Sequence, residues 1–333
     1  MGIKNLLKFL LNYKDIIKET NINNYYGKKI AIDISILLYQ IVISIRNSGS
    51  DIYNSDGKVI SHIIGLFNKT LILLNKGIIP IYVFDGPPPK IKYNLLYFRK
   101  KCKEYALNKL NDVQNDDEKI KYLKRSVIIT KEQINECKQL LEYMGIPYIN
   151  AIEEADSELS YLCKNNLVYA VLTEDMDILT FGSPKIIRNL LSYTKQPFEI
   201  DLNSILDKLN LNHNEFIDLC ILFGCDYCPI LDINNNTIYN IYMKSKSIDI
   251  TLNELQILGY KIPKNFYNNF NIAKKYFSES IHTDININIL KLNIPNYEKL
   301  LDLLVIKNNL NKFKIINKLN NLYLIYNKFK NIN

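Results

Sequence analysis

The sequence of 333 residues contains no tryptophan, three histidines and six cysteines. Six cysteines in a chain of this length do not make a disulfide framework, so we expect free thiols in a reducing compartment. The pair in "CDYC", Cys225 and Cys228, has no second pair at zinc spacing and is interpreted as packing. The histidines do not lie beside a candidate nucleophile; they are His62, His213 and His282. Motifs of the types G-x-S-x-G, P-loop and G-x-G-x-x-G are also missing, which excludes the enzymes that depend on them.

The chain also lacks long apolar runs. None approaches the ~20 residues that a membrane-spanning helix needs. The first residues, "MGIKNLLKFLLNYKD", are interrupted by Lys and Asn, which argues against a secretory signal. Leu6 stands where the myristoylation pattern requires Ser or Thr. We therefore expect an intracellular protein with no membrane partner.

The composition is that of a soluble globular protein, with 47% hydrophobic and 23% charged residues and a mean hydropathy of -0.09. This is enough apolar material for a sizeable core and more than one lobe. The net charge of +8 suggests an anionic partner, although basic charge is informative only where the positive residues cluster. Asn and Ile are abundant, above all after residue 230, which is typical of an AT-rich genome.

Apolar runs alternate with helical patterns, which predicts an α/β fold with a mainly parallel sheet flanked by helices. The expected strands are residues 28–33, 78–86, 147–150, 167–172 and 185–190. The expected helices between them are residues 34–46, 59–77, 130–145 and 155–166, with Gly77 as a helix end. After about residue 211 the pattern is mostly helical.

One segment, residues 88–130, fits no strand–helix unit. It reads as two charged helices joined near "QNDDE", too polar for a core, and therefore as an excursion from the sheet. The predicted organisation is an N-terminal part of the core, an insertion, an internal part of the core and a helical C-terminal region, at residues 1–87, 88–130, 131–229 and 230–333.

Carboxylates follow several of the expected strands. In "VYAVLTEDMDILTFG", an apolar run breaks into Glu174, Asp175 and Asp177, and like charges so close destabilise a fold unless a cation neutralises them. Ligands of parallel sheets sit outside the carboxyl ends of the strands, so strand topology brings such acids to one edge. The acids expected to converge are Asp33, Asp85, Glu154, Asp156, Asp175, Asp177 and Asp226.

Hard oxygen ligands in this number suit Mg²⁺ or Mn²⁺, and two ions about 4 Å apart would clamp the attacking and leaving oxygens of a phosphate ester. An alternative exists for each acid alone, because a single Asp at a strand end is usually a turn former or a helix cap. Glu154 and Asp156 could merely complement a helix dipole, with Glu153 and Glu158 as rivals. For each acid taken alone, a structural role as a turn former or helix cap is favoured. The seven acids taken together favour a metal site.

The motifs resemble one family. "MGIKNLL", "IAIDISILLYQ", "SHIIGLF", "IPIYVFDGPPP", "MGIPYINAIEEAD", "VYAVLTEDMDILTFG" and "LFGCDYC" occur in order from residue 1 to about 229, and "IPNYEKLLDLL" continues more weakly. They are similar to the flap endonuclease branch of the XPG-type structure-specific 5′ nucleases. The resemblance implies a PIN-like nuclease fold with a helical arch insertion and a degenerate helix–hairpin–helix in the C-terminal region.

The resemblance also implies a ligand set for two Mg²⁺ ions, with Mn²⁺ able to substitute. One ion would be held by Asp33, Asp85, Glu154 and Asp156, and the other by Asp175, Asp177 and Asp226 with Asp156 near both. It selects Glu154 and Asp156 over their rivals and makes Glu174 a neighbour. Asp85 and Asp177 also count among the catalytic residues, with Lys92 and Arg99.

The same resemblance assigns contacts to DNA. Tyr39 would stack on a base, with core packing as the alternative. Lys92 and Arg99 would reach the scissile phosphate, with a solvated helix face as the alternative. The insertion would be an arch for a single-stranded 5′ end. The other expected contacts are Gly2, exposed by methionine removal, Arg46, Lys69, Lys103, Lys121, Lys124 and Arg125.

Two features depart from the family. In place of the G-I-G-P core that grips duplex DNA and potassium, the chain reads "LDINNNT", so Asp232, Asn234 and Asn235 put potassium binding in doubt. Asn tolerates left-handed backbone, so the hairpin itself could persist. The end of the chain, "YLIYNKFKNIN", shows no sliding-clamp-binding motif. With the AT-rich composition, this favours a large DNA virus as the source, or else an AT-rich unicellular eukaryote.

The function expected from the resemblance is Mg²⁺-dependent cleavage of 5′ flaps near the junction of single strand and duplex, with 5′ to 3′ exonuclease activity at nicks or gaps. Such an enzyme serves replication, repair or recombination, as a monomer in the nucleus or at a cytoplasmic viral replication site. The alternatives are a junction-resolving nuclease of the same superfamily, a non-catalytic DNA-binding scaffold and a small-molecule phosphatase.

Overall fold

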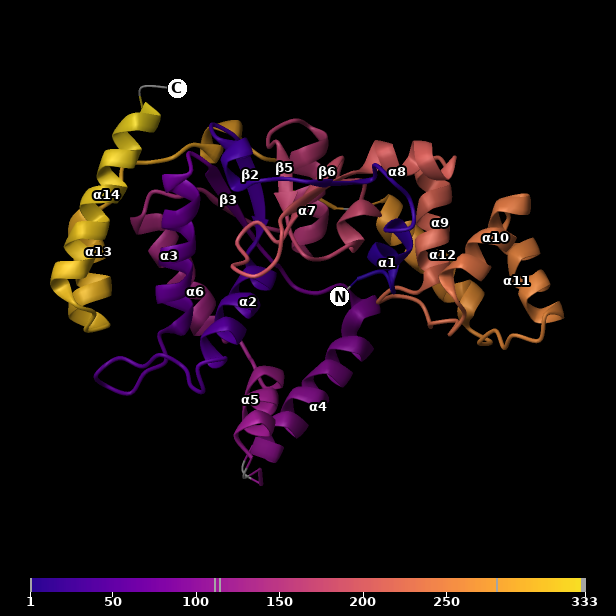
Figure 1. Cartoon of the computed structure of the whole chain (residues 1–333), viewed down its shortest axis with the longest axis horizontal. Coiled ribbons are helices and arrows are strands. Elements are labelled where there is room, and N and C mark those ends of the chain that lie inside the picture. The colour runs from indigo at the N-terminus through magenta and orange to yellow at the C-terminus, as the bar shows by residue number, and fades with distance from the viewer. Residues whose placement is uncertain (1, 111, 114, 280, 331–333) are drawn as a thin grey trace. The chain divides into compact units, whose positions relative to one another are not determined.

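Seven strands form one mixed, mostly parallel sheet flanked by helices in the computed structural model, which describes residues 2–110, 112–113, 115–279 and 281–330 (Figure 1). The α/β fold predicted from the sequence is confirmed. The strands are β1 (Ile17–Glu19), β2 (Lys29–Asp33), β3 (Ile79–Phe84), β4 (Tyr148–Asn150), β5 (Ala170–Leu172), β6 (Lys185–Arg188) and β7 (Phe198–Asp201).

Helices account for most of the remaining chain, and those beyond residue 211 confirm the helical C-terminal region. The α-helices are α1 (Leu6–Leu10), α2 (Ile34–Arg46), α3 (Ser61–Asn75), α4 (Tyr93–Leu110), α5 (Asp116–Arg125), α6 (Lys131–Tyr143), α7 (Ala155–Lys164), α8 (Leu202–Leu209), α9 (His213–Phe223), α10 (Asn235–Ser245), α11 (Ile248–Ile257), α12 (Phe266–Ser278), α13 (Tyr297–Leu301) and α14 (Lys312–Lys330). The shorter segments are the 3₁₀ turns η1 (Ile22–Tyr25), η2 (Lys90–Lys92), η3 (Asp177–Leu179) and η4 (Ile287–Leu290) and the π-helical η5 (Asp302–Lys307). Among the described residues, no helix combines the length and the apolar character that a membrane crossing requires.

The chain divides into two units, each made of separate stretches. The first comprises Met1–Asn21, Asp85–Tyr93 and Ala151–Thr283, and the second comprises Ile22–Phe84, Asn94–Asn150 and Asp284–Asn333. Strands follow the order β1-β7-β6-β5 in the first unit and β2-β3-β4 in the second. The four-part organisation predicted from the sequence describes functional parts and stays a prediction.

In the second unit the strands are parallel, as predicted. β2 pairs with β3 from Lys29 opposite Ile79 to Asp33 opposite Val83, and β3 pairs with β4. All six residues of β3 are buried, as expected for a parallel strand that is covered on both faces. α2 and α3 pack on each other and on β3, and α6 packs on α3.

Among the described residues of the first unit, one pair of strands is parallel. β5 and β6 run parallel with Leu172 opposite Ile187, whereas β7 runs antiparallel to both β6 and β1. β1 and β7 were not predicted from the sequence, because "IKE" and "FEID" contain charged and partly exposed side chains and form no apolar run. The sheet is therefore mixed and not wholly parallel.

Several helices begin or end at residues suited to that position. Asp33, where β2 ends, caps α2 by accepting a hydrogen bond from the backbone N of Ile36 at 3.1 Å. Thr130 and Gln133 form a capping box at α6. Gly77 follows α3 with φ +72°, a conformation that favours glycine, so the predicted helix end is confirmed.

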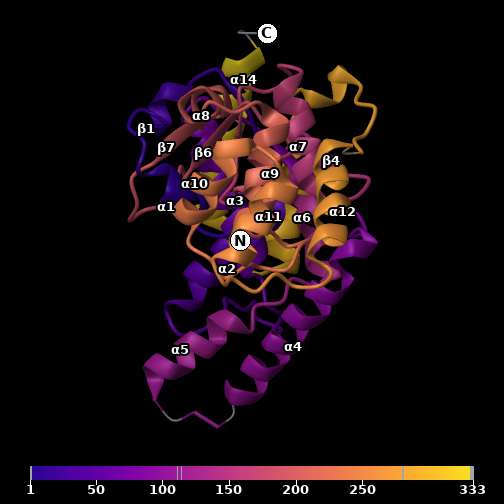
Figure 2. The same ribbon diagram turned by 90° about the vertical axis from the view of Figure 1, so that its right-hand side faces the viewer.

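The insertion consists of helices α4 and α5 after the short turn η2, which confirms the prediction of two charged helices (Figure 2). Within the second unit, α5 packs on α2. The contact depends on the side chain at the end of α2, Arg46.

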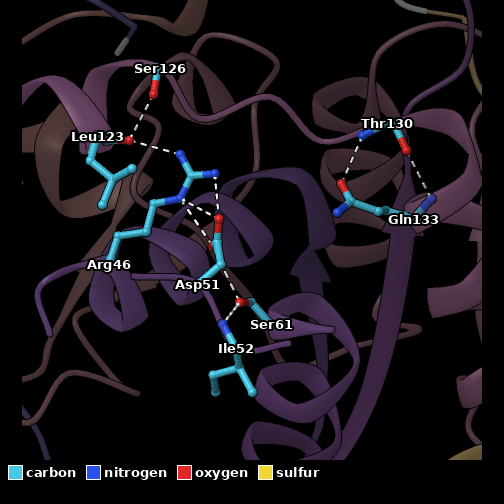
Figure 3. A network of polar contacts seen from close by, with 8 residues as sticks. All are labelled: Arg46, Asp51, Ile52, Ser61, Leu123, Ser126, Thr130 and Gln133. Atoms are coloured by element: carbon cyan, nitrogen blue, oxygen red, sulfur yellow. Dashed lines mark hydrogen bonds and ion pairs between the residues drawn. The ribbon is translucent and has the colours of Figure 1, made fainter. Parts of the chain in front are cut away.

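Arg46 joins α2 to α5 through a shielded polar network (Figure 3). Its Nη2 pairs with Asp51 Oδ2 at 2.9 Å, and its Nη1 donates to the carbonyl oxygen of Leu123 at 2.7 Å. The Arg46 and Asp51 side chains are only 14% and 7% exposed. Ser61 Oγ donates to Asp51 Oδ1 at 3.3 Å and accepts from the backbone N of Ile52 at 2.9 Å. α5 is therefore held against α2 by the hydrogen bond from Arg46 to Leu123, and the shielded ion pair with Asp51 fixes the guanidinium that donates it.

Replacing Asp51 tests this network. Asp51→Ala is expected to lower the free energy of unfolding by about 2–4 kcal/mol, because it leaves the shielded charge of Arg46 without its partner. Denaturant unfolding followed by circular dichroism measures the loss. Asp56→Ala in the same loop is the control, since Asp56 is exposed and its change is expected to stay within about 0.5 kcal/mol. Equal losses in both variants would contradict the stabilising role of the ion pair.

Candidate active site

Six of the seven predicted metal ligands belong to the first unit, namely Asp85, Glu154, Asp156, Asp175, Asp177 and Asp226. They follow β3, begin α7, follow β5 and follow α9, which are the positions expected from the sequence. The seventh, Asp33, belongs to the second unit. Its carboxylate caps α2, so the alternative interpretation of this residue as a helix cap is confirmed, and its role as a ligand stays a prediction.

Hydrogen bonds tie the loop after β3 to the start of α7. Asp85 Oδ1 accepts from the backbone N of Ala155 at 2.9 Å, and Gly86 N donates to the carbonyl oxygen of Glu153 at 2.6 Å. A Cβ atom on Gly86 would lie 2.4 Å from the carbonyl oxygen of Ala151. Only glycine allows this approach, which brings Asp85 beside the start of α7. Glu154 and Asp156 lie there.

Glu154 is bound through both of its carboxylate oxygens. Lys92 Nζ pairs with Oε1, while the hydroxyls of Tyr227 and Tyr276 donate to Oε2 at 2.5 and 3.1 Å. Tyr227 lies in the turn after α9 and Tyr276 lies in α12. Because the Glu154 side chain is only 12% exposed, these donors decide its orientation.

Lys92 supplies positive charge among the acids. Its side chain is 11% exposed, and its Nζ lies 4.0 Å from Asp226 Oδ2 and 5.1 Å from the centre of the Tyr227 ring. Burial alone would lower the pKa of Lys92, but the carboxylates of Glu154 and Asp156 outweigh burial and raise it. Lys92 therefore remains an ammonium ion at neutral pH.

Asp175 and Asp177 follow β5 in a tight turn. The backbone N of Asp175 donates to Thr173 Oγ1, and that of Asp177 donates to Asp175 Oδ1, both at 3.1 Å. Asp177 is 2% exposed, and its Oδ1 has no hydrogen-bond partner among the described residues. Burial raises the pKa of both carboxyls, and the charges of Asp175 and Asp226 raise that of Asp177 further. These carboxylates hold more negative charge than Lys92 neutralises.

The N-terminal segment lies against the same pair of acids. A Cβ atom on Gly2 would be 2.0 Å from Asp175 Oδ1 and 2.7 Å from Asp177 Oδ1. Gly2 also has a φ of +82°, a backbone conformation that residues other than glycine rarely adopt. The backbone N of Lys4 donates to the carbonyl oxygen of Gly224 at 2.8 Å and holds the segment in place. Gly2 therefore lies against Asp175 and Asp177, and its expected contact with DNA stays a prediction.

The neighbouring acids have other partners. Glu174 pairs with Arg188 at 3.0 Å and accepts from the backbone N of Asn189 at 2.7 Å. Glu158 is fully buried, and its Oε2 accepts from the backbone N and Oγ1 of Thr283 at 2.8 and 2.6 Å. Glu158 Oε1 has no hydrogen-bond partner among the described residues, so the interpretation that neither Glu174 nor Glu158 is a metal ligand stays a prediction.

Among the described residues, no group of three or more His, Cys, Asp or Glu side chains is arranged to hold a metal ion. The chemistry of the donors nevertheless fits a divalent cation, because carboxylate oxygens are the ligands that Mg²⁺ and Mn²⁺ prefer. Asp177 Oδ1 is a buried acceptor, and a cation would supply the charge that the raised pKa values of Asp175 and Asp177 show to be missing.

The other predicted contacts to DNA belong to the second unit: Tyr39, Arg46, Lys69, Arg99, Lys103, Lys121, Lys124 and Arg125. Lys103 Nζ in α4 donates to the hydroxyl of Tyr39 in α2 and lies 4.5 Å from the centre of its ring. Lys121 and Arg125 are exposed on α5. Arg46 forms the ion pair described above. The roles of these residues in DNA binding stay predictions.

The "LDINNNT" segment leads into α10 without left-handed residues. Asn234 has φ -65° and caps α10 by accepting from the backbone N of Asn236 at 2.8 Å. Asp232 pairs with Lys4 at 3.2 Å, and Asn235 Nδ2 donates to the carbonyl oxygen of Lys4 at 2.9 Å. The negative charge of Asp232, which we expected beside DNA, thus has a cationic partner in the chain itself.

Sequence reasoning missed the two tyrosines that bind Glu154. Tyr227 lies within a quoted motif but was not singled out, and Tyr276 lies in a helix with no motif. The chain contains 24 tyrosines, and no spacing distinguishes these two from the others.

The buried acids predict a pH-dependent stability. In the presence of EDTA, Asp177→Asn is expected to stabilise the protein near neutral pH by about 1 kcal/mol or more, since each unit of raised pKa corresponds to about 1.4 kcal/mol. A carboxyl with a raised folded-state pKa favours folding below its ordinary value of 3.8, and this contribution is lost as the pH rises through the raised pKa. The gain should therefore be large near neutral pH and small near pH 3.8.

Thermal unfolding across this pH range measures the difference. Asp207→Asn on the exposed side of α8 is the control and should match the wild type at every pH. A melting temperature of Asp177→Asn equal to that of the wild type near neutral pH would show that folding does not raise the pKa of Asp177.

Comparison with known proteins identifies one family. Residues 1–106 match the XPG N-terminal domain, and residues 145–226 match the XPG I-region. Flap endonuclease 1-A of Oryza sativa subsp. japonica is 38% identical over 337 residues, which cover 98% of this chain and 88% of the rice protein. The solved structure of flap endonuclease-1 from Methanococcus jannaschii matches with a TM-score of 0.74 and 33% identity, covering 94% of this chain and 97% of that chain.

The junction-resolving enzyme GEN1 is similar in fold. Its structure in complex with product DNA, Mg²⁺ and Mn²⁺ ions matches with a TM-score of 0.58 and 18% identity, covering 97% of this chain and 74% of that chain. The relatives named here give no support to the predicted viral origin. The two XPG regions and the near full-length identity to the rice enzyme together show that the chain belongs to the XPG family, as a homologue of flap endonuclease 1.

Proposed function

We propose that this chain cuts 5′ flaps of branched DNA near the junction of single strand and duplex, and that it also acts on 5′ ends at nicks and gaps. As a flap endonuclease 1-like structure-specific 5′ nuclease, it is a phosphodiester hydrolase. We further propose that it acts as a monomer in the nucleus, during replication, repair or recombination.

The buried acids around Lys92 carry this proposal. A site that simply bound phosphate would be basic, whereas this one holds several carboxylates around one ammonium group. Polyanionic DNA can approach such acids only if divalent cations lie between the two sets of oxygens. The arrangement therefore favours cation-dependent hydrolysis of a phosphodiester over simple DNA binding.

Two Mg²⁺ ions, with Mn²⁺ able to substitute, are the cofactors we propose. Asp33, Asp85, Glu154 and Asp156 would hold one, and Asp175, Asp177 and Asp226, with Asp156 near both, would hold the other. When bound, such ions activate a water molecule and neutralise charge on phosphate oxygens. The potassium site of the family is not part of the proposal.

The protein's own cations complete the site. The ammonium group of Lys92 pairs with Glu154 and lies 4.0 Å from Asp226, so it is in position to donate to a phosphate oxygen that enters among these acids. Arg99 in α4 would add a planar guanidinium with several parallel donors. Both would act where negative charge grows in the transition state.

The exposed face of α4 suits a single strand. Phe98 and Tyr105 are 64% and 58% exposed and lie seven residues apart, hence on one face of the helix. Lys101, with 56% of its side chain exposed, lies between them. Aromatic rings and lysines together are typical of surfaces that bind single strands, because bases stack on the rings and ammonium groups pair with phosphates. We propose that the 5′ strand passes along this face, with residues 88–130 as the arch.

The catalytic acids can be tested on a panel of labelled DNA that includes a 5′ flap, a nick, a gap and a four-way junction, with and without Mg²⁺. Asp175→Ala and Asp177→Ala are each expected to reduce flap cleavage at least about 100-fold, because they remove charge that holds the cations. Asp207→Ala is the control and should keep full activity. Unchanged cleavage by the first two variants would refute the catalytic assignment. Faster cleavage of the four-way junction than of the flap would favour the junction-resolving alternative.

The path of the single strand can be tested by fluorescence, since the chain contains no tryptophan. In Phe98→Trp, a 5′ flap is expected to quench the emission by stacking on the indole. Leu107→Trp is the control, because Leu107 is 51% exposed but lies nine residues further along α4, on the opposite face. Phe98→Ala should weaken flap binding by about 1–3 kcal/mol. Equal quenching in both tryptophan variants would place the strand elsewhere.

A further inference from the structure

One side chain from outside the family motifs reaches the acidic site. The hydroxyl of Tyr276, in α12, donates to Glu154 Oε2 at 3.1 Å, and the hydroxyl of Tyr227 donates to the same oxygen at 2.5 Å. The other oxygen, Oε1, pairs with Lys92. The two oxygens of this carboxylate therefore have different partners. Neutral hydroxyls bind Oε2, and the ammonium group of Lys92 binds Oε1.

The phenol ring of Tyr276 is held by other rings. Its centre lies 5.0 Å from that of Tyr227 and 5.7 Å from that of Phe181. The next residue, Phe277, is buried and packs on the same two rings at 5.3 and 5.2 Å. The Tyr276 hydroxyl is therefore positioned before any ligand arrives.

The helix that carries Tyr276 is itself anchored. Lys274 Nζ pairs with Asp218 Oδ1 of α9 at 2.6 Å, and Asp218 is only 6% exposed. The hydroxyl of Tyr242 in α10 donates to Asp218 at 3.4 Å. Because α12 is fixed against α9 in this way, its tyrosine cannot easily move away from Glu154.

We propose that Tyr276 is a positioning residue that, together with Tyr227, fixes the orientation of Glu154 and so leaves Oε1 as the oxygen that would hold a divalent cation. A carboxylate rotates readily about its last torsion, so a ligand of this type needs partners that fix it. Because both hydroxyls bind Oε2, Oε1 would be the oxygen that Glu154 offers to a divalent cation beside Lys92. This inference rests on the proposed function and adds a residue to it.

The neutrality of tyrosine is essential to this role. Lys92 already offsets part of the charge of Glu154, so a second cationic side chain on Oε2 would remove the rest, whereas a hydroxyl orients the carboxylate and leaves its charge in place. Lys92, which pairs with Oε1, is positioned by the same side chain. Cation binding and the placement of Lys92 would thus depend on the same carboxylate.

Direct binding of Mn²⁺ without DNA tests the proposal, with free Mn²⁺ followed by electron paramagnetic resonance. Tyr276→Phe is expected to weaken Mn²⁺ binding about 10-fold, as is typical when a partner of a metal ligand is removed. The Mg²⁺ concentration for half-maximal flap cleavage should rise by a similar factor, with the rate recovering at saturating Mg²⁺. Tyr267→Phe is the control, since it removes a hydroxyl from a 48% exposed position of the same helix. Wild-type affinity in Tyr276→Phe would overturn the proposal.

A second measurement is independent of metal. In EDTA, Tyr276→Phe should lower the melting temperature of the wild type but not that of Glu154→Ala, because the partner of the hydroxyl is already gone. An equal loss in both backgrounds would show that the tyrosine acts only through packing. If the wild-type protein neither binds Mn²⁺ nor cuts a flap, the proposed function is wrong. If the wild type does both and Tyr276→Phe binds Mn²⁺ and cuts the flap equally well, only the positioning role is wrong.

Discussion

Carboxylates gathered in a buried place repel one another, and this repulsion is the constraint on which the site depends. The chain answers it in part with the ammonium group of Lys92, placed against Glu154 and near Asp226. Burial and the repulsion that Lys92 does not offset raise the pKa values of Asp175 and Asp177. The fold holds these acids in spite of that cost, through the hydrogen bonds of the loop after β3 and the turn after β5. A folded chain keeps such a cluster where it serves a function that a neutral site cannot.

Much of this could be predicted from the sequence, because strand ends are local features. The apolar runs before Asp33 and Asp85 predicted β2 and β3, and parallel topology then placed the acids at strand ends. The contact between Tyr276 and Glu154 could not be predicted in this way. It spans 122 positions along the chain and depends on the packing of α12, which no local pattern describes. β1 and β7 were missed for a related reason, since they are short and their side chains are partly exposed.

Basic residues illustrate the limit of reasoning from charge. The net charge of +8 indicates an anionic partner, yet several cations serve the fold. Arg46, which is paired with Asp51, holds α5 through the carbonyl oxygen of Leu123, and Lys274 anchors α12 through Asp218. Lys4 neutralises Asp232 beside the N-terminal segment. A contact to DNA is therefore better inferred from exposed cations beside aromatic rings, as on α4, than from the count of lysines and arginines.

The close approach of Gly2 to Asp175 and Asp177 has a practical consequence for handling the protein. Any other amino acid at this position would direct its side chain against the two carboxylates, where there is no space even for a methyl group. An expression plasmid should therefore keep the glycine codon at position 2, because even Gly2→Ala would force the acidic pair to shift.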